Sequence, residues 1–326
     1  MHVDADTLNR AQGCLLGQLA GDSLGSLVEF QSPEEILRKY PDGVRELRDG
    51  GTWGTLAGQP TDDSEMALML ARSLMKCRGY DPEATRKAYV MWLNSAPFDC
   101  GNTVRRGLRG DPDHHSQANG AMMRASPLGI FCCNHDPERT ADFAHQDARL
   151  THPHPVCVQA NALFVMGLAH TIAIGMKPHE TYEYVQKCAS DMKGKPALMK
   201  AVANAATSPP HDYVSQQGWV LIAFQNALWQ LLHAENLEEG VIDTVMRGGD
   251  TDTNAAIAGA LLGAVYGLDA VPRQWRERLL NCRPERGKQN VMHPRPECFW
   301  PVDAMEIARC LVAGGMTDAE VAISLI

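Results

Sequence analysis

The amino-acid sequence predicts an all-α protein built as one domain. No alternation of apolar and polar residues, the pattern of a half-buried strand, persists over several segments of the 326 residues. Glycines recur at every fourth position near the N-terminus, which is typical of a helix that packs closely against another. Hydrophobic residues make up 44% of the chain, enough for a sizeable core, and no low-complexity linker divides it. We therefore expect a single domain over residues 1–326.

The first predicted helix covers residues 7–27. Its glycines at positions 13, 17, 21 and 25 lie on one face and allow a close approach of a second helix. A transmembrane pairing face is the other interpretation of this spacing, but Gln18 and Asp22 interrupt the segment and it is too short. Glu29 follows directly, and it is either an ordinary exposed acid or a buried functional one.

Helical patterns continue along the rest of the chain, separated by polar, glycine-rich or proline-containing loops. A glycine-rich loop is expected over residues 41–60, a polar loop over 111–118 and a proline-containing break at 150–155. A further helix begins near 98–103, and another surrounds Trp275 before a loop over 283–296. The other helices are expected at 62–76, 82–93, 156–173, 179–191, 196–206, 218–233, 237–246, 255–266, 303–312 and 317–325.

Two short acidic motifs precede helices far apart in the sequence. The first is Thr61-Asp62-Asp63-Ser64, in which Asp62 and Glu65 have the spacing of a capping box, so a helix cap and a functional site are both reasonable interpretations. The second is Gly248-Gly249-Asp250-Thr251-Asp252-Thr253, where the paired glycines allow a tight turn. Like charges this close repel one another unless a cation or a helix N-terminus stabilises them.

The acids and threonines of these motifs form an all-oxygen ligand set. Hard cations such as Mg²⁺ and Mn²⁺ prefer oxygen ligands, whereas zinc prefers histidine and cysteine. Four carboxylates exceed what one octahedral Mg²⁺ usually binds, so we expect two ions. The set consists of Thr61, Asp62, Asp63, Asp250, Asp252 and Thr253.

Other motifs fit less well. A calcium loop starting at Asp250 would need glycine and glutamate where Ala255 and Leu261 stand, and the sequence has neither a P-loop nor a G-x-S-x-G motif. The adjacent His114 and His115 are more consistent with an exposed loop than with a metal site. A metal phosphohydrolase using His211 and Asp212 lacks a second histidine at helical spacing.

The net charge of −9 argues against non-specific nucleic-acid binding. The N-terminal residues lack the features of a signal peptide, and the apolar runs look too short or too interrupted to span a bilayer, so we expect no membrane partner. Ten scattered cysteines without a C-x-x-C pair fit reduced thiols and a cytoplasmic location.

Six motifs in order resemble those of the ADP-ribosylglycohydrolase family, which includes the dinitrogenase-reductase-activating glycohydrolase and the ADP-ribosyl-acceptor hydrolases. They span residues 13 to about 267. The motifs are Gly21-Asp22-Ser23-Leu24-Gly25 with Glu29, Thr61-Asp62-Asp63-Ser64, Asp99-Cys100-Gly101-Asn102-Thr103, Asn119-Gly120-Ala121-Met122-Met123-Arg124, Thr151-His152-Pro153 and Gly248-Gly249-Asp250-Thr251-Asp252-Thr253.

The resemblance implies a compact orthogonal helical bundle with two Mg²⁺ or Mn²⁺ ions held by the six residues named above. It implies that Glu29 lies over the metals on the ribose side and that Asp99 takes part in acid–base chemistry, as proposed for some members. The positions that match substrate-binding residues are Asn102, Ser116, Gln117, Asn119, Gly120 and His152, and Trp219 stands where relatives often have tyrosine. Some relatives carry an aromatic residue near Gln117, so the adenine partner here is open.

The implied activity is metal-dependent hydrolysis of the bond between ADP-ribose and an acceptor on a modified protein. The N-glycosidic bond of ADP-ribosyl-arginine is the first expectation, and serine-linked or small-molecule derivatives are the alternatives. A non-catalytic ADP-ribose-binding or structural relative is a further alternative, but a degenerate site has no need for clustered acids.

Overall fold

The computed structural model describes residues 4–314, which form fifteen α-helices and four short 3-10 helices, with isolated bridges in place of strands. The predicted all-α class is therefore confirmed. The helix predicted at residues 317–325 lies outside the described residues. The α-helices are α1 (Ala5–Gly25), α2 (Pro33–Lys39), α3 (Asp62–Cys77), α4 (Pro82–Asn94), α5 (Asn102–Leu108), α6 (Ser126–Phe131), α7 (Pro137–Arg149), α8 (Pro155–Ile174), α9 (Pro178–Asp191), α10 (Pro196–Asn204), α11 (Val220–His233), α12 (Leu237–Met246), α13 (Thr251–Tyr266), α14 (Arg273–Asn281) and α15 (Ala304–Val312).

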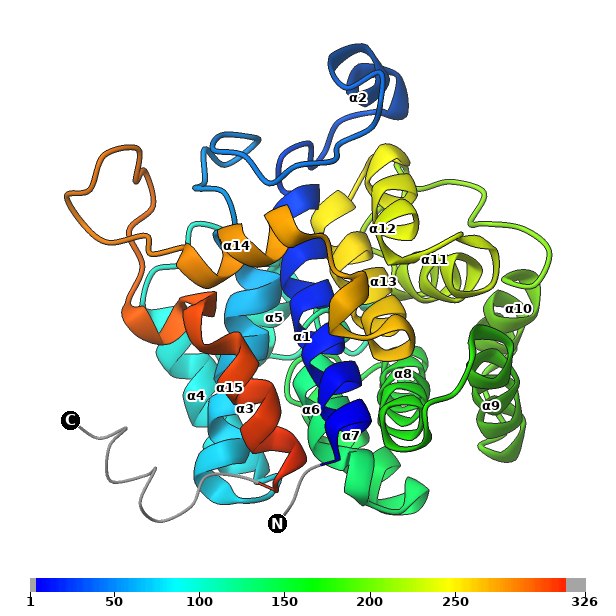
Figure 1. The fold of residues 1–326 in the computed structure, drawn as a ribbon. Helices are drawn as coiled ribbons and strands as arrows, with labels where there is room; N and C mark the ends of the chain where they lie inside the picture. Colours follow the sequence, from blue (N-terminus) through cyan, green and yellow to red (C-terminus); the bar gives the residue numbers. More distant parts are fainter. Residues whose placement is uncertain (1–3, 315–326) are drawn as a thin grey trace.

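Helices α1 and α13 form the centre of the molecule, packed side by side in opposite directions (Figure 1). The predicted glycine face of α1 makes this contact. A Cβ atom added at any of its four glycines would lie less than 3 Å from the backbone of α13 or of Gly267, the residue that ends it. The two backbones can approach this closely only because side chains are absent.

The remaining helices surround this central pair. Helices α3, α4 and α15 lie on one side of it, and α9, α10 and α11 on the other (Figure 1). Helix α8 is 20 residues long and apolar enough to cross a membrane by length and composition, so the expectation that no apolar run is long enough was wrong. In the apolar 18-residue stretch of this helix, 78% of the residues are buried in the protein, as in the core helix of a globular protein.

The capping box predicted at the start of α3 is wrong. Thr61 is the N-cap residue of α3 and its side chain makes no capping hydrogen bond. Glu65 instead binds the buried guanidinium of Arg295, with Nε–Oε1 and Nη2–Oε2 distances of 2.7 and 2.8 Å. A true capping box is formed at α2, where Ser32 and Glu35 each accept a backbone hydrogen bond from the other.

The glycine pair before α13 adopts the tight turn expected from the sequence. Gly248 and Gly249 have φ values of 74° and 76°, in the left-handed region. The Gly249 backbone exchanges two hydrogen bonds with the segment after α1, donating to the carbonyl of Gln31 and accepting from the N–H of Phe30. This exchange brings Glu29 next to the acidic start of α13.

Candidate active site

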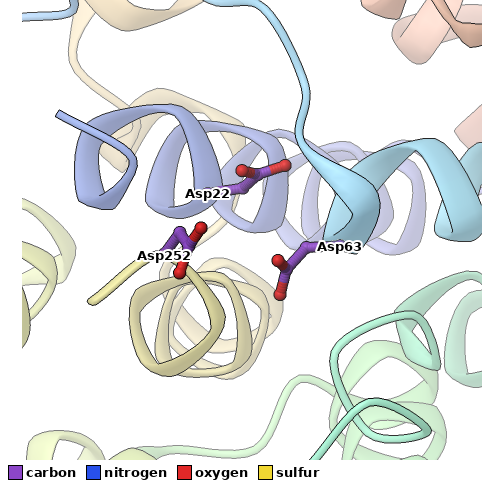
Figure 2. Close-up of side chains that lie close together, drawn as sticks. All are labelled: Asp22, Asp63 and Asp252. Atoms are coloured by element: carbon purple, nitrogen blue, oxygen red, sulfur yellow. The ribbon is translucent and has the colours of Figure 1, made fainter. Parts of the chain in front are cut away.

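Acidic side chains from three elements meet where α1 ends and where α3 and α13 begin. One carboxylate oxygen from each of Asp22, Asp63 and Asp252 lies within 4.8 Å of the other two, and all three residues are buried. Figure 2 shows these side chains in the space between the three helices. A second group, formed by Glu29, Asp250 and Asp252, meets the same 4.8 Å limit. Asp252 belongs to both groups and therefore connects them.

Asp22 holds the start of α3 in place. Its carboxylate accepts hydrogen bonds from the Thr61 hydroxyl at 2.8 Å, the Thr61 backbone N–H at 3.1 Å and the Ser64 N–H at 3.2 Å. Both carboxylate oxygens of Asp22 therefore already accept hydrogen bonds from the start of α3. The sequence analysis included Asp22 in a family motif but gave it no role, and an aspartate on the glycine face of a buried helix was the available signal.

Two oxygens of the cluster are without a partner. Asp63 Oδ1 and Asp252 Oδ2 are buried and accept no hydrogen bond from any of the residues 4–314. A buried carboxylate oxygen without a donor is costly unless a cation is bound to it. These two atoms, with Asp250 and the threonine hydroxyls nearby, match the ligand chemistry of Mg²⁺ or Mn²⁺, so the residues present fit a hard divalent cation.

Burial and mutual repulsion disfavour the ionised state of these acids. Burial, and then the charges of Asp99 and Asp250, raise the pKa of Glu29 to about 8. Burial raises the pKa of Asp63 and Asp252 well above the usual value, and neighbouring acids add to the effect. Burial raises the pKa of Asp62 in the same way, followed by the charge of Asp99. Bound cations would remove this repulsion.

These shifts predict that divalent cations stabilise the protein more at high pH. A raised carboxyl pKa means that the folded chain keeps a proton that the unfolded chain has already lost. The free energy of unfolding is therefore highest at low pH and falls as the pH rises through the two pKa values. For Glu29 the window runs from 4.5 to about 8. We expect the metal-free protein to lose stability across this window, and Mg²⁺ or Mn²⁺ to restore about 2.7 kcal/mol at one hundred times Kd.

Thermal unfolding with and without the cation at pH 5 and pH 8 checks this prediction. Sodium chloride at matched ionic strength is the control, since it screens charges without binding between carboxylates. A melting temperature at pH 8 that excess Mg²⁺ and Mn²⁺ leave unchanged would contradict the assignment of a cation site.

A cleft of about 380 Å³ opens beside the acidic cluster. Asn119 lies in its wall and donates a hydrogen bond of 2.6 Å from Nδ2 to Asp250 Oδ2, which ties this predicted substrate-binding residue to the acidic cluster. Nine of the predicted site residues line this cleft: Glu29, Asp62, Asp99, Asn102, Asn119, Gly120, His152, Asp250 and Thr253.

The other predicted residues lie close by but outside the cleft lining. Ser116 shares a 2.8 Å hydrogen bond with Thr103, and Gln117 accepts one of 3.1 Å from the indole N–H of Trp219. Trp219 lines a neighbouring cavity of about 520 Å³ between α10, α11 and the loop before α11, which also contains His211 and Asp212. Thr61, Asp63 and Asp252 lie behind the cleft, buried in the acidic cluster.

Sequence reasoning missed two contacts made by side chains near the acidic residues. The indole of Trp53 donates a 2.5 Å hydrogen bond to Glu29 Oε2 from the glycine-rich loop 41–60. Arg295, from the loop after α14, donates to the carbonyl of Ser95 at 3.0 Å in addition to its pair with Glu65. Nearby, the rings of Phe98 and His293 stack with centroids 4.5 Å apart, next to Asp99.

Comparisons with known proteins point to one family. Residues 3–297 match the family model described as ADP-ribosylglycohydrolase. The chain is 32% identical over 290 residues to the ADP-ribosyl-[dinitrogen reductase] glycohydrolase of Rhodospirillum rubrum, with 83% of this chain and 90% of that protein covered. It is 27% identical to the ADP-ribosylarginine hydrolase Tri1 of Pseudomonas putida, covering 83% of this chain and 74% of that protein. It is 26% identical to the human ADP-ribosylhydrolase ARH3, with 84% of this chain and 90% of that protein covered.

A solved structure titled ADP-ribosylglycohydrolase-related protein complex superposes with a TM-score of 0.78 at 28% identity, covering 95% of this chain and 99% of that chain. The helical architecture, the acidic cluster and the match over nearly the whole sequence agree with the motif resemblance. The chain belongs to the ADP-ribosylglycohydrolase family.

Proposed function

We propose that this protein is a metal-dependent hydrolase that releases ADP-ribose from ADP-ribosyl-arginine on modified proteins. The observation that carries the proposal is the meeting of Glu29, Asp63, Asp250 and Asp252 beside a cleft, where two buried carboxylate oxygens accept no hydrogen bond from the described residues. The family supports ADP-ribosyl hydrolase activity. The choice of arginine is supported by the relatives named as ADP-ribosylarginine hydrolases.

The cation ligands in this proposal are the six residues predicted from the sequence. Thr61, Asp62, Asp63, Asp250, Asp252 and Thr253 would hold two Mg²⁺ or Mn²⁺ ions. Bound there, the ions would supply Lewis-acid chemistry toward ribose hydroxyls and water. Asp22 keeps Thr61 and the α3 N-terminus in place, and Asn119 orients Asp250 from the cleft side.

The protein's own carboxyl groups would transfer the protons of the reaction. Cleavage of the glycosidic bond requires a proton on the departing acceptor and removal of one from the attacking water. Glu29 and Asp99 both line the cleft on the side of the cations and are the candidates for this role. The indole hydrogen bond from Trp53 fixes one oxygen of Glu29 and so orients its carboxyl group beside the cleft.

A substrate panel tests the proposal. The purified protein is incubated with arginine-linked and serine-linked ADP-ribosyl proteins and with small ADP-ribose derivatives, each with Mg²⁺, Mn²⁺ or a chelator, and released ADP-ribose is measured. We expect the fastest release from the arginine-linked protein and none with the chelator. Release from serine-linked or small substrates alone would overturn the choice of acceptor. Cation-dependent stabilisation without release from any substrate would instead favour a non-catalytic relative.

A further inference from the structure

A chain of buried hydrogen bonds leads from a charged residue in the core to the cleft. Arg124 is fully buried and pairs with Asp147, with Nε 3.2 Å from Oδ2. Its Nη1 donates to the Thr151 hydroxyl at 2.9 Å and to the Gly120 carbonyl at 3.2 Å. The Thr151 hydroxyl lies 2.7 Å from Nδ1 of His152.

The donor and acceptor of each hydrogen bond in this series can be assigned by counting hydrogens. The guanidinium of Arg124 only donates, so the Thr151 hydroxyl accepts from it. That hydroxyl has one hydrogen of its own, and Nδ1 of His152 is its remaining neighbour among the hydrogen bonds of the described chain. If Nδ1 carried the proton instead, the hydroxyl hydrogen would be buried without an acceptor, which costs free energy.

The other ring nitrogen of His152 is left without a partner in the described part of the chain, in a residue that lines the cleft. His152 is fully buried, and its Nε2 has no hydrogen-bond partner among residues 4–314. The residue lines the cleft beside Gly120. A Cβ atom at position 120 would lie 3.3 Å from Nε2, closer than an ordinary contact, so the glycine leaves room beside this nitrogen.

We propose that Arg124 and Thr151 hold His152 in the tautomer with the proton on Nε2, so that the ring presents a neutral hydrogen-bond donor to a ligand oxygen in the cleft. Thr151 and Arg124 are positioning residues in this scheme. The oxygen is a phosphoryl or hydroxyl oxygen of the nucleoside diphosphate sugar, and only this identification of the ligand rests on the proposed function.

The same environment keeps the ring uncharged at neutral pH. Burial, followed by the positive charge of Arg124, lowers the pKa of His152 to about 3. A neutral imidazole with a fixed Nε2 proton can donate a hydrogen bond but has no second proton to give to a leaving group. His152 therefore binds an oxygen and does not serve as a general acid.

Nitrogen NMR of the intact protein tests the tautomer directly. The protein is labelled with ¹⁵N-histidine, and the His152 signals are assigned by their loss in His152→Gln. We expect an unprotonated Nδ1 and a protonated Nε2 from pH 6 to pH 8. A protonated Nδ1 in the wild-type spectrum would overturn the proposal, and this result depends on neither turnover nor ligand binding.

Variants at Thr151 test the positioning role. Thr151→Val keeps the volume and removes the hydroxyl, while Arg124 retains Gly120 and Asp147 as acceptors. We expect loss of the fixed tautomer and about tenfold weaker ADP-ribose binding by calorimetry, the effect of one hydrogen bond, with Thr151→Ser restoring both. Thr171→Val, at a buried threonine bonded to Thr181 between α8 and α9, is the matched control and should change neither.

The outcomes of these measurements are distinct. An unchanged tautomer and unchanged affinity in Thr151→Val would overturn the positioning role. If Thr151→Val does not fold, the wild-type spectrum decides alone. Failure of the proposed hydrolysis with the Nε2–H tautomer present would refute the activity and leave the hydrogen-bond assignment intact.

Discussion

Replacing Asp252 by asparagine is expected to abolish cation-dependent release of ADP-ribose and to leave the fold intact. Asp252 belongs to both acidic groups, and its Oδ2 is one of the two buried oxygens of the cluster that accept no hydrogen bond from residues 4–314. The variant keeps the size of the side chain and an oxygen that can accept the hydrogen bond from the Thr253 N–H. It loses the negative charge that a hard cation requires, so we expect a fall in rate of about 10³-fold.

The stability of the same variant distinguishes a functional acid from a structural one. Removing one of several repelling charges should leave the metal-free protein at pH 8 as stable as the wild type or more stable, while the stabilisation by Mg²⁺ or Mn²⁺ is lost. Asp142→Asn, on the exposed surface of α7, is the control and should change neither rate nor stability. Full activity in Asp252→Asn would refute its assignment as a cation ligand.

Replacing Gly17 by alanine is expected to destabilise the protein by about 3 kcal/mol, the upper part of the range for overpacked cores. Helix propensity alone predicts the opposite sign, since alanine is favoured over glycine within a helix by about 1 kcal/mol. The difference comes from the α1–α13 contact, where the new Cβ would lie less than 3 Å from the carbonyl group of Gly259. Neither backbone can move away without disturbing the acids at the end of the pair.

Denaturant unfolding followed by circular dichroism measures this effect. Gly79→Ala is the matched control, because the nearest atom to an added Cβ there is the Cys77 carbonyl oxygen at 3.9 Å, and we expect a change close to zero. A Gly17→Ala variant more stable than the wild type would show that the two helices can separate at little cost.

The features that the sequence predicted are those with a local pattern. The glycines every four residues, the paired acids and the double glycine are each visible within a short window. The glycines lie along the α1–α13 contact, and the acids lie where α1, α3 and α13 meet. Helix ends were mostly within a few residues of those observed, because prolines and polar caps mark them.

The features that were missed depend on contacts between distant residues. Glu65 looked like a capping residue because its partner, Arg295, is 230 positions away. Trp53 is one aromatic residue in a loop, and nothing nearby in sequence marks it as a donor to Glu29. No range was predicted for α2, α6 and α7. Of these, α2 and α6, of seven and six residues, are too short to show a clear period.

The glycine contact between α1 and α13 also fixes the register of the two helices. Each missing side chain on α1 faces main-chain atoms of its partner, so sliding one helix by a residue would place a bulkier side chain against a carbonyl group. Gly25 faces the Cα atom of Asp252, and Asp22 lies one turn before it. Contacts between main-chain atoms therefore set the distance between Asp22 on α1 and Asp252 on α13. Substitutions elsewhere in the core should therefore lower the free energy of unfolding without changing the selectivity of the site among cations of different size.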